Sequence, residues 1–177
     1  MSNLLQPQKF SLSLRILHWL MAVLVLAMLI IGILMASHCA GYYATLLAWH
    51  RPIGILLLIL VFVRLTIRIL SKIPALPEDL SSSQKFAAKA SHVGLYGLLF
   101  LMPLLGWGML SAGNYPIRLF PGLELPAFLQ GNQPLWHLLR EYHSWAAFAL
   151  FVLIILHITA ALHHKFIRRD KILDQML

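Results

Sequence analysis

The sequence has little of what a soluble, disordered or disulfide-bonded protein needs. Charged residues make up only 11% of its 177 residues, whereas hydrophobic residues make up 60%. Soluble domains average about a quarter charged residues, so a water-exposed fold of this composition would lack the charge that keeps it in solution. Disordered chains are poor in apolar residues, and a disulfide scaffold needs more than Cys39, the single cysteine. The composition therefore predicts a small integral membrane protein.

Four apolar stretches are long enough to cross a bilayer, which takes about 20 mostly apolar residues. They cover residues 16–36, 44–63, 93–112 and 144–162, and none of them contains Asp or Glu. With their flanking turns, we expect helices at about 14–36, 44–70, 86–112 and 140–166. The predicted fold class is all-α: one transmembrane domain, residues 1–177, folded as a four-helix bundle. Residues 113–133, rich in proline and glycine, are expected to form an extracytoplasmic loop with room for a short interfacial helix.

The distribution of positive charge predicts how the bundle is oriented. A net charge of +8 could indicate a nucleic-acid partner, but in a membrane protein Lys and Arg gather in the cytoplasmic segments. Of the 14 Lys and Arg, only Arg51, Arg118 and Arg140 lie on one side of the predicted spans, and the other eleven lie near the termini or between the second and third spans. Both termini are therefore predicted to be cytoplasmic, and no nucleic-acid partner is expected.

Histidines within the spans are the strongest functional signal, because an ionisable side chain in hydrocarbon is costly and usually has a function. His143 and His157 lie 14 residues apart on the fourth span, so they share a helix face at depths that differ by about 21 Å. The direction of the first span places His18 near the cytoplasmic side, level with His157. The second span runs the opposite way and places His50 level with His143. Two cross-helix histidine pairs follow, while His92 is expected at the start of the third helix.

Opposed neutral imidazoles in a helix bundle are suited to filling the two axial positions of a haem iron. Because the sequence has no Cys-x-x-Cys-His, such haems would be non-covalent and b-type. Gly54, Gly94 and Gly97 would leave room for a flat ring. The alternatives are four unrelated hydrogen-bonded histidines or a zinc site, but zinc prefers three or four converging ligands, often including acids or thiolates.

Four arginines near the ends of the spans are secondary candidates. Arg51 and Arg140 are positioned to neutralise haem propionates on the outer side or to anchor the interface, and with Arg118 they could steer an anion. Arg64, 14 residues after His50, is a candidate contact of a propionate or a quinone oxygen, or a residue that snorkels to the surface.

These motifs resemble those of the bacterial cytochrome b561 family of di-haem, four-helix membrane cytochromes, and the resemblance covers nearly the whole chain. The matching segments are Leu17-His18-Trp19, His50-Arg51-Pro52-Ile53-Gly54 with Val63-Arg64, Ala90-Ser91-His92, His143 and His157 at the family's spacing, Ala160-Ala161-Leu162-His163-His164, and Arg169-Asp170-Lys171-Ile172-Leu173. The resemblance implies two haem b, one held by His18 and His157 on the cytoplasmic side and one held by His50 and His143 on the outer side.

The resemblance also implies a function in the bacterial inner membrane. The best understood members are superoxide oxidases, in which superoxide on the outer side gives an electron that passes through both haems to ubiquinone. His164 and Arg64 match positions that the family places near the quinone. We therefore expect an oxidoreductase of the superoxide:ubiquinone type. The alternatives are a cytochrome b subunit that relays electrons to or from a redox partner protein, and a haem-free transporter or scaffold, for which the spans lack the usual carboxylates.

Overall fold

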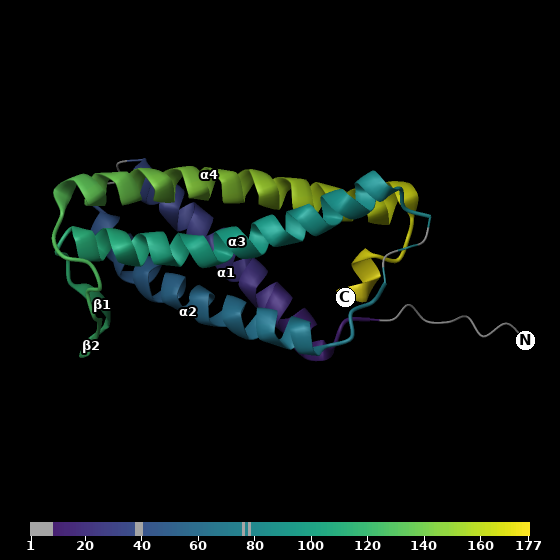
Figure 1. Cartoon of the computed structure of the whole chain (residues 1–177), viewed down its shortest axis with the longest axis horizontal. Coiled ribbons are helices and arrows are strands. Elements are labelled where there is room, and N and C mark those ends of the chain that lie inside the picture. Colours follow the sequence, from purple (N-terminus) through teal and green to yellow (C-terminus); the bar gives the residue numbers. More distant parts are fainter. Residues whose placement is uncertain (1–8, 38–40, 76, 78) are drawn as a thin grey trace, which may run out of the picture.

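The protein is described here by a computed structural model, which covers residues 9–37, 41–75, 77 and 79–177. Cys39 lies outside these residues. Four long helices dominate the fold: α1 (Leu12–Ala36), α2 (Tyr43–Leu70), α3 (Ser82–Ala112) and α4 (Gln133–His163). A π-helical turn, η1 (His164–Arg168), continues α4, and a short 3₁₀ helix, η2 (Leu173–Gln175), ends the chain. The prediction of an α-helical bundle is confirmed (Figure 1).

All four helices are long and apolar enough to cross a membrane. Large apolar side chains cover their outer surfaces, for example Phe62 and Phe148, which are 65% and 60% exposed. Such surfaces are stable only against hydrocarbon, because water would impose the full hydrophobic penalty on them. The chain is therefore a multi-pass membrane protein.

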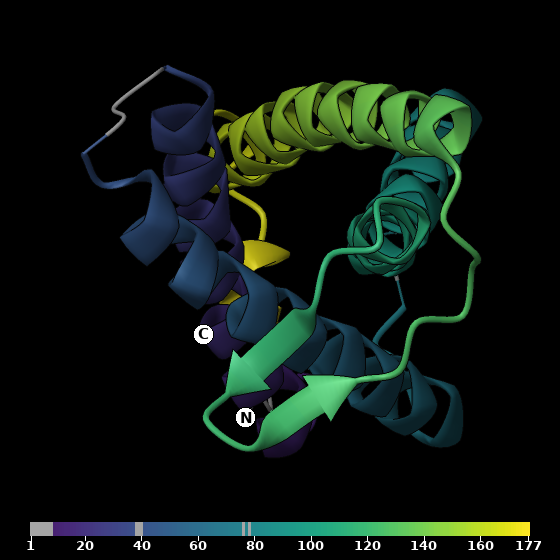
Figure 2. The ribbon, with the colours of Figure 1, turned by 90° about the vertical axis from the view of Figure 1, so that its left-hand side faces the viewer.

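Two closely packed helix pairs make up the bundle. α1 packs against α2 and α3 packs against α4, and the pairs are joined mainly through α2 and α3. Figure 2 views the bundle from one end and shows α1 and α2 on one side, with α3 and α4 on the other. The buried core lies at mid-height and contains Met21, Val25, Leu57, Val61 and Leu150.

The third and fourth helices begin earlier than the predicted residues 86 and 140, and local capping explains both differences. Ser81 and Gln84 form a capping box: the Gln84 N–H donates to the Ser81 hydroxyl and the Ser81 N–H donates to the Gln84 side chain. At α4, the Asn132 side chain accepts from the Leu135 N–H, and Pro134 occupies the first turn. Lys85, just before the predicted start, is therefore on α3, and His92 lies well inside that helix rather than at its start.

The segment between α3 and α4 differs from the prediction of an interfacial helix. It contains a two-stranded antiparallel hairpin, β1 (Ile117–Phe120) and β2 (Leu123–Leu125), and Gly122 adopts a positive φ of 83° in the turn. Ile117 of β1 is buried, and the Trp107 indole N–H donates to the Pro126 carbonyl at 3.0 Å. The hairpin is thus fixed against the end of the bundle rather than projecting freely.

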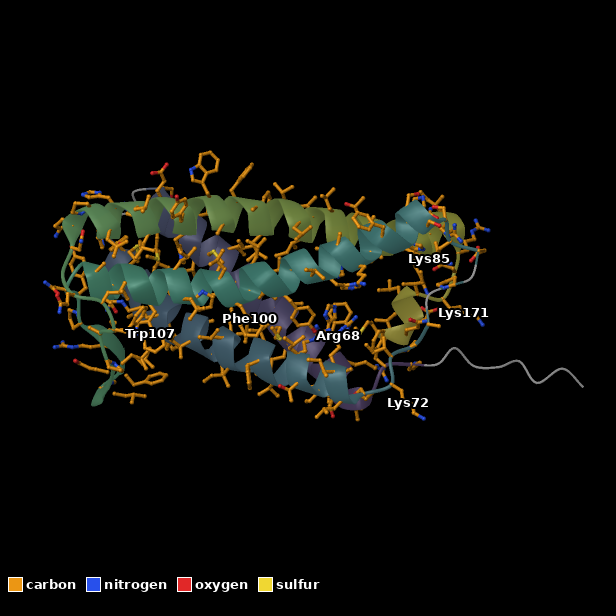
Figure 3. All side chains as sticks on the ribbon, viewed as in Figure 1. Arg68, Lys72, Lys85, Phe100, Trp107 and Lys171 are labelled. Atoms are coloured by element: carbon orange, nitrogen blue, oxygen red, sulfur yellow. The ribbon has the colours of Figure 1, made fainter. Side chains whose placement is uncertain are left out.

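The first described residues and the C-terminus lie at the opposite end of the bundle from the hairpin (Figure 1). The Phe10 N–H donates to the Gln175 carbonyl, and the Trp19 indole N–H donates to the Met176 carbonyl. Lys72, Lys85 and Lys171 gather at this same end, far from Trp107 (Figure 3). This segregation of lysines matches the charge distribution from which a cytoplasmic position of both termini was predicted.

Candidate functional site

The structure brings together both histidine pairs that were predicted from their depths. The ring centres of His18 on α1 and His157 on α4 lie 6.3 Å apart, and those of His50 on α2 and His143 on α4 lie 6.2 Å apart. The ring planes are inclined by 70° and 63°. A metal–imidazole nitrogen bond is about 2 Å long, so two rings on opposite sides of one metal have centres roughly 6 Å apart. Both separations therefore fit two imidazoles that share one iron.

A mainly apolar cavity of ≈ 540 Å³ surrounds the outer pair, His50 and His143, which we call the outer histidine pair. Its size lies in the usual range for ligand and cofactor sites. All four helices and the hairpin contribute to its walls. The Nδ1 atom of His50 is buried without a hydrogen-bond partner in the described part of the chain. A buried polar atom beside an apolar cavity is the arrangement expected where a metal-bearing apolar ligand binds.

Glycines keep this cavity open, although only one of them is among those proposed from the sequence. Gly32, Gly54 and Gly106 all line it. A Cβ atom at Gly106 would lie 3.5 Å from Cε1 of His143, so this glycine adjoins the ring directly. Gly94, by contrast, faces Leu153 of α4 at 2.9 Å and permits close helix packing rather than making room for a ligand.

The inner pair, His18 and His157, has a cationic neighbour. One Arg64 N–H group donates to the Tyr96 hydroxyl at 2.7 Å, and another lies 3.4 Å from Nδ1 of His18. The Arg64 guanidinium also lies over the Tyr96 ring at 5.6 Å. Of the alternatives left open for Arg64, snorkelling to the surface is wrong, because the side chain is half-buried and points into the bundle.

His92 was predicted at the start of the third helix but lies inside α3, beside the inner pair. Its ring centre lies 5.7 Å from that of His157, whereas the ring centre of His18 lies 6.3 Å from that of His157. The Ser81–Gln84 capping box gave the missing signal, since starting α3 at Ser82 places His92 about 15 Å along the helix. Within the described residues, no three His, Cys, Asp or Glu side chains are grouped as a bare metal ion requires. His157 thus forms two imidazole pairs at the inner site, one with His18 and one with His92.

The outer arginines have different surroundings. Arg51 lines the cavity beside the outer histidine pair and donates to the Pro116 carbonyl at 3.4 Å. Arg140 is exposed and lies over the Trp136 ring at 5.3 Å. Arg118 forms an exposed ion pair with Glu124 across the hairpin at 2.6 Å, so its charge is locally balanced. Arg51 is therefore the arginine of this group that is placed to act on a group bound in the cavity.

His164 lies seven residues, or nearly two turns, after His157 and on the same face of the helix. Its Nδ1 atom lies 2.6 Å from a carboxylate oxygen of Asp170, and both side chains are largely buried. Arg168 donates to the same oxygen at 3.1 Å and to Asp79 at 2.5 Å. The predicted quinone-side residue is thus part of an ionic network at the end of the bundle where the chain termini lie.

Comparisons with known proteins agree with this architecture. The family model described as "Prokaryotic cytochrome b561" matches residues 9–177. The chain is similar to cytochrome b561 homolog 2 of Escherichia coli K12, with 32% identity over 97% of this chain and 92% of the relative. It is also similar to cytochrome b561 homolog 1 of the same organism, with 30% identity over 72% of each chain.

A third relative carries a functional name. The probable superoxide oxidase CybB of Yersinia pestis is 28% identical over 90% of both chains. The family implies haem b binding and electron transfer in the membrane, which agrees with paired imidazoles at two depths. On the family match over nearly the whole chain and the similarity to the Escherichia coli relatives, this protein belongs to the prokaryotic cytochrome b561 family.

Proposed function

We propose that the protein holds two haem b groups and conducts electrons across the bacterial inner membrane. His18 and His157 would hold the inner haem, and His50 and His143 the outer haem. When bound, each haem supplies a one-electron redox centre. The observation that supports this assignment best is the separation of the ring centres, 6.3 Å and 6.2 Å, in two pairs drawn from three helices.

The protein's own part in this function is to position the two haems and to keep water out of the space between them. If two imidazoles hold each iron, substrates would exchange electrons without binding the metal. The buried core between the two pairs, which includes Val25, Leu57 and Leu150, excludes water from the space between them. With His143 and His157 about 21 Å apart along α4, the two sites reach towards opposite faces of the bilayer.

Charged groups favour a direction from an outer anion to an inner quinone. Arg51 beside the outer site provides positive charge for a haem propionate or an approaching anion such as superoxide. At the inner end, Arg64 and His164 provide hydrogen-bond donors of the kind that a ubiquinone headgroup needs. The name of the Yersinia relative supports superoxide as the outer donor. We therefore propose superoxide:ubiquinone oxidoreductase activity.

Stopped-flow spectroscopy of the purified holoprotein tests this activity. When a pulse of superoxide is mixed with the protein, the haems are expected to become reduced. Added ubiquinone is then expected to reoxidise them. Superoxide dismutase added before the pulse is the control and should abolish the reduction. If the haems stay oxidised after the pulse, superoxide is not the donor. Reduction only in the presence of a co-purifying protein would favour the alternative of a cytochrome b subunit.

A substitution at Gly106 tests the outer site separately. In Gly106→Leu the branched side chain would extend from a Cβ position only 3.5 Å from the His143 ring into the cavity, and an overpacked site cannot relax without displacing that ring. We expect the variant to lose about one haem per chain while the inner haem remains. Haem quantification of the purified variant measures this. Gly106→Ala is the matched control, because its Cβ makes an ordinary contact and should leave both haems bound.

A further inference from the structure

The turn that follows α4 brings an acidic side chain back onto His164. Arg169 adopts a left-handed conformation with φ 57°, which is unusual for a residue other than glycine. As a result, the Arg169 and Asp170 N–H groups both donate to the His164 carbonyl. This backbone geometry folds the Asp170 carboxylate over the His164 ring rather than letting it point to solvent.

The contact is specific for one ring nitrogen. A carboxylate oxygen of Asp170 lies 2.6 Å from Nδ1 of His164, a short, charge-assisted distance. The other carboxylate oxygen accepts from the Ile172 N–H at 3.2 Å. Burial alone would raise the pKa of Asp170, but hydrogen bonds from His164, the Ile172 N–H and Arg168 lower it below its ordinary value. The carboxyl group is therefore ionised at neutral pH, so it can only accept a hydrogen bond from Nδ1–H of His164.

Arg168 holds the carboxylate in place. It donates to Asp170 through Nε and to Asp79 of the α2–α3 connection through Nη2. The Asp170 side chain is 16% exposed and that of Arg168 is 23% exposed, so this contact is shielded from solvent much more than a surface ion pair is. Asp170 is thus fixed from two sides, and the His164 ring takes its orientation from it.

We propose that Asp170 is a positioning residue that fixes the ring and the tautomer of His164, so that Nε2 of His164 serves as the proton donor to a reduced quinone. The inference rests on the proposed function, because it assigns the protonation step to the quinone end. The arrangement is that of a carboxylate that orients a general acid–base histidine.

One quinone accepts two electrons, one from each of two outer one-electron donors, and two protons to form the quinol. His164 supplies one of these protons: the Nε2–H bond of protonated His164 breaks and an O–H bond forms on the nearer quinone oxygen, while water supplies the proton to the other oxygen. His164 is left neutral with its remaining proton on Nδ1, held by Asp170. It then takes a new proton at Nε2 from water at the end of the bundle where the chain termini lie.

Single-turnover reoxidation of the haems by ubiquinone tests the proposal in the full-length holoprotein. We expect Asp170→Asn to slow reoxidation about tenfold or more, since general acid catalysis commonly contributes 10²–10⁴-fold and a misoriented acid forfeits part of it. Haem content and haem reduction from the outer side should be unchanged. Asp170→Glu should restore part of the rate. Asp174→Asn is the matched control: Asp174 pairs with Lys165 at 2.5 Å in the same tail and should leave the rate unchanged.

A double-variant cycle separates positioning from a structural effect. If Asp170 acts through His164, His164→Ala should be at least as slow as Asp170→Asn, and the double variant should be no slower than His164→Ala. The proposal would be overturned if the rate losses of the two single variants multiplied in the double variant. It would also be overturned if either single variant reoxidised its haems at the normal rate.

Nitrogen NMR of labelled histidine provides a readout that is independent of turnover. Neutral His164 should carry its proton on Nδ1 in the parent protein and should populate both tautomers in Asp170→Asn. An unchanged tautomer would overturn the proposal. If the parent protein passes no electrons to ubiquinone at all, the proposed acceptor is wrong, and the NMR comparison still tests whether Asp170 sets the tautomer.

Discussion

His143→Ala is expected to lower the haem content of the purified protein from two per chain to one. The ring centres of His143 and His50 lie 6.2 Å apart beside the cavity, and the substitution would remove one of the two side chains that would hold the outer haem. A non-covalent haem with a single histidine in an apolar cavity loses a large part of its binding free energy, so it should dissociate during purification. Haem extraction and the amplitude of the reduced-minus-oxidised spectrum both measure this loss.

A matched control for this variant lies on the same helix. The His137 ring meets the Trp136 ring edge to face at the exposed outer end of α4 and has no opposed imidazole at the pair distance within the described residues. His137→Ala should keep both haems and the full spectrum. Equal haem contents in His143→Ala and His137→Ala would mean that His143 is not a ligand.

His157→Ala is expected to separate the two halves of the electron path. The outer histidine pair is intact in this variant, so superoxide should still reduce one haem. Quinol formation should fall to the rate of haem-free protein, because the apolar core, including Val61 and Leu150, would lie between the reduced haem and the quinone. The measurement follows haem reduction and quinol formation in vesicles after the same superoxide pulse.

His92→Ala provides the control for the inner site. His92 lies closer to His157 than His18 does, so distance alone does not exclude it as the partner of His157. With His18 as the ligand, His92→Ala should keep two haems and form quinol, whereas His18→Ala should lose the inner haem. The reverse result would assign the inner haem to His92 and His157.

Much of the fold could be predicted from the sequence because the membrane imposes simple rules. Long apolar stretches without acids predicted the four helices, and the bias of Lys and Arg predicted a cytoplasmic side; Lys72, Lys85 and Lys171 gather at one end of the bundle in the structure. The helix starts were less accurate, since hydropathy locates the apolar centre of a span and not its polar cap. The Ser81–Gln84 box and Asn132 set those starts. The hairpin was missed because its strands are only four and three residues long.

The candidate site was partly predictable for a related reason. Helix direction and a rise of about 1.5 Å per residue set the depths of His18, His50, His143 and His157, so their pairing followed from arithmetic. The lateral positions of side chains did not follow, because they depend on how the helices are rotated and packed. For this reason Gly106 was overlooked, and the closeness of His92 to His157 emerged only in the structure. Asp170 was seen only as part of a tail motif, since the left-handed turn at Arg169 that folds it onto His164 has no glycine to mark it.

The most direct test of the account is a spectrum of the purified wild-type protein, reduced with dithionite and compared with its oxidised form, together with the haem content per chain. We expect two b-type haems per chain, both low-spin as two histidine ligands require. A folded but colourless protein, or haem in a high-spin state with a free coordination position, would contradict the claim that two opposed imidazole pairs each hold an iron.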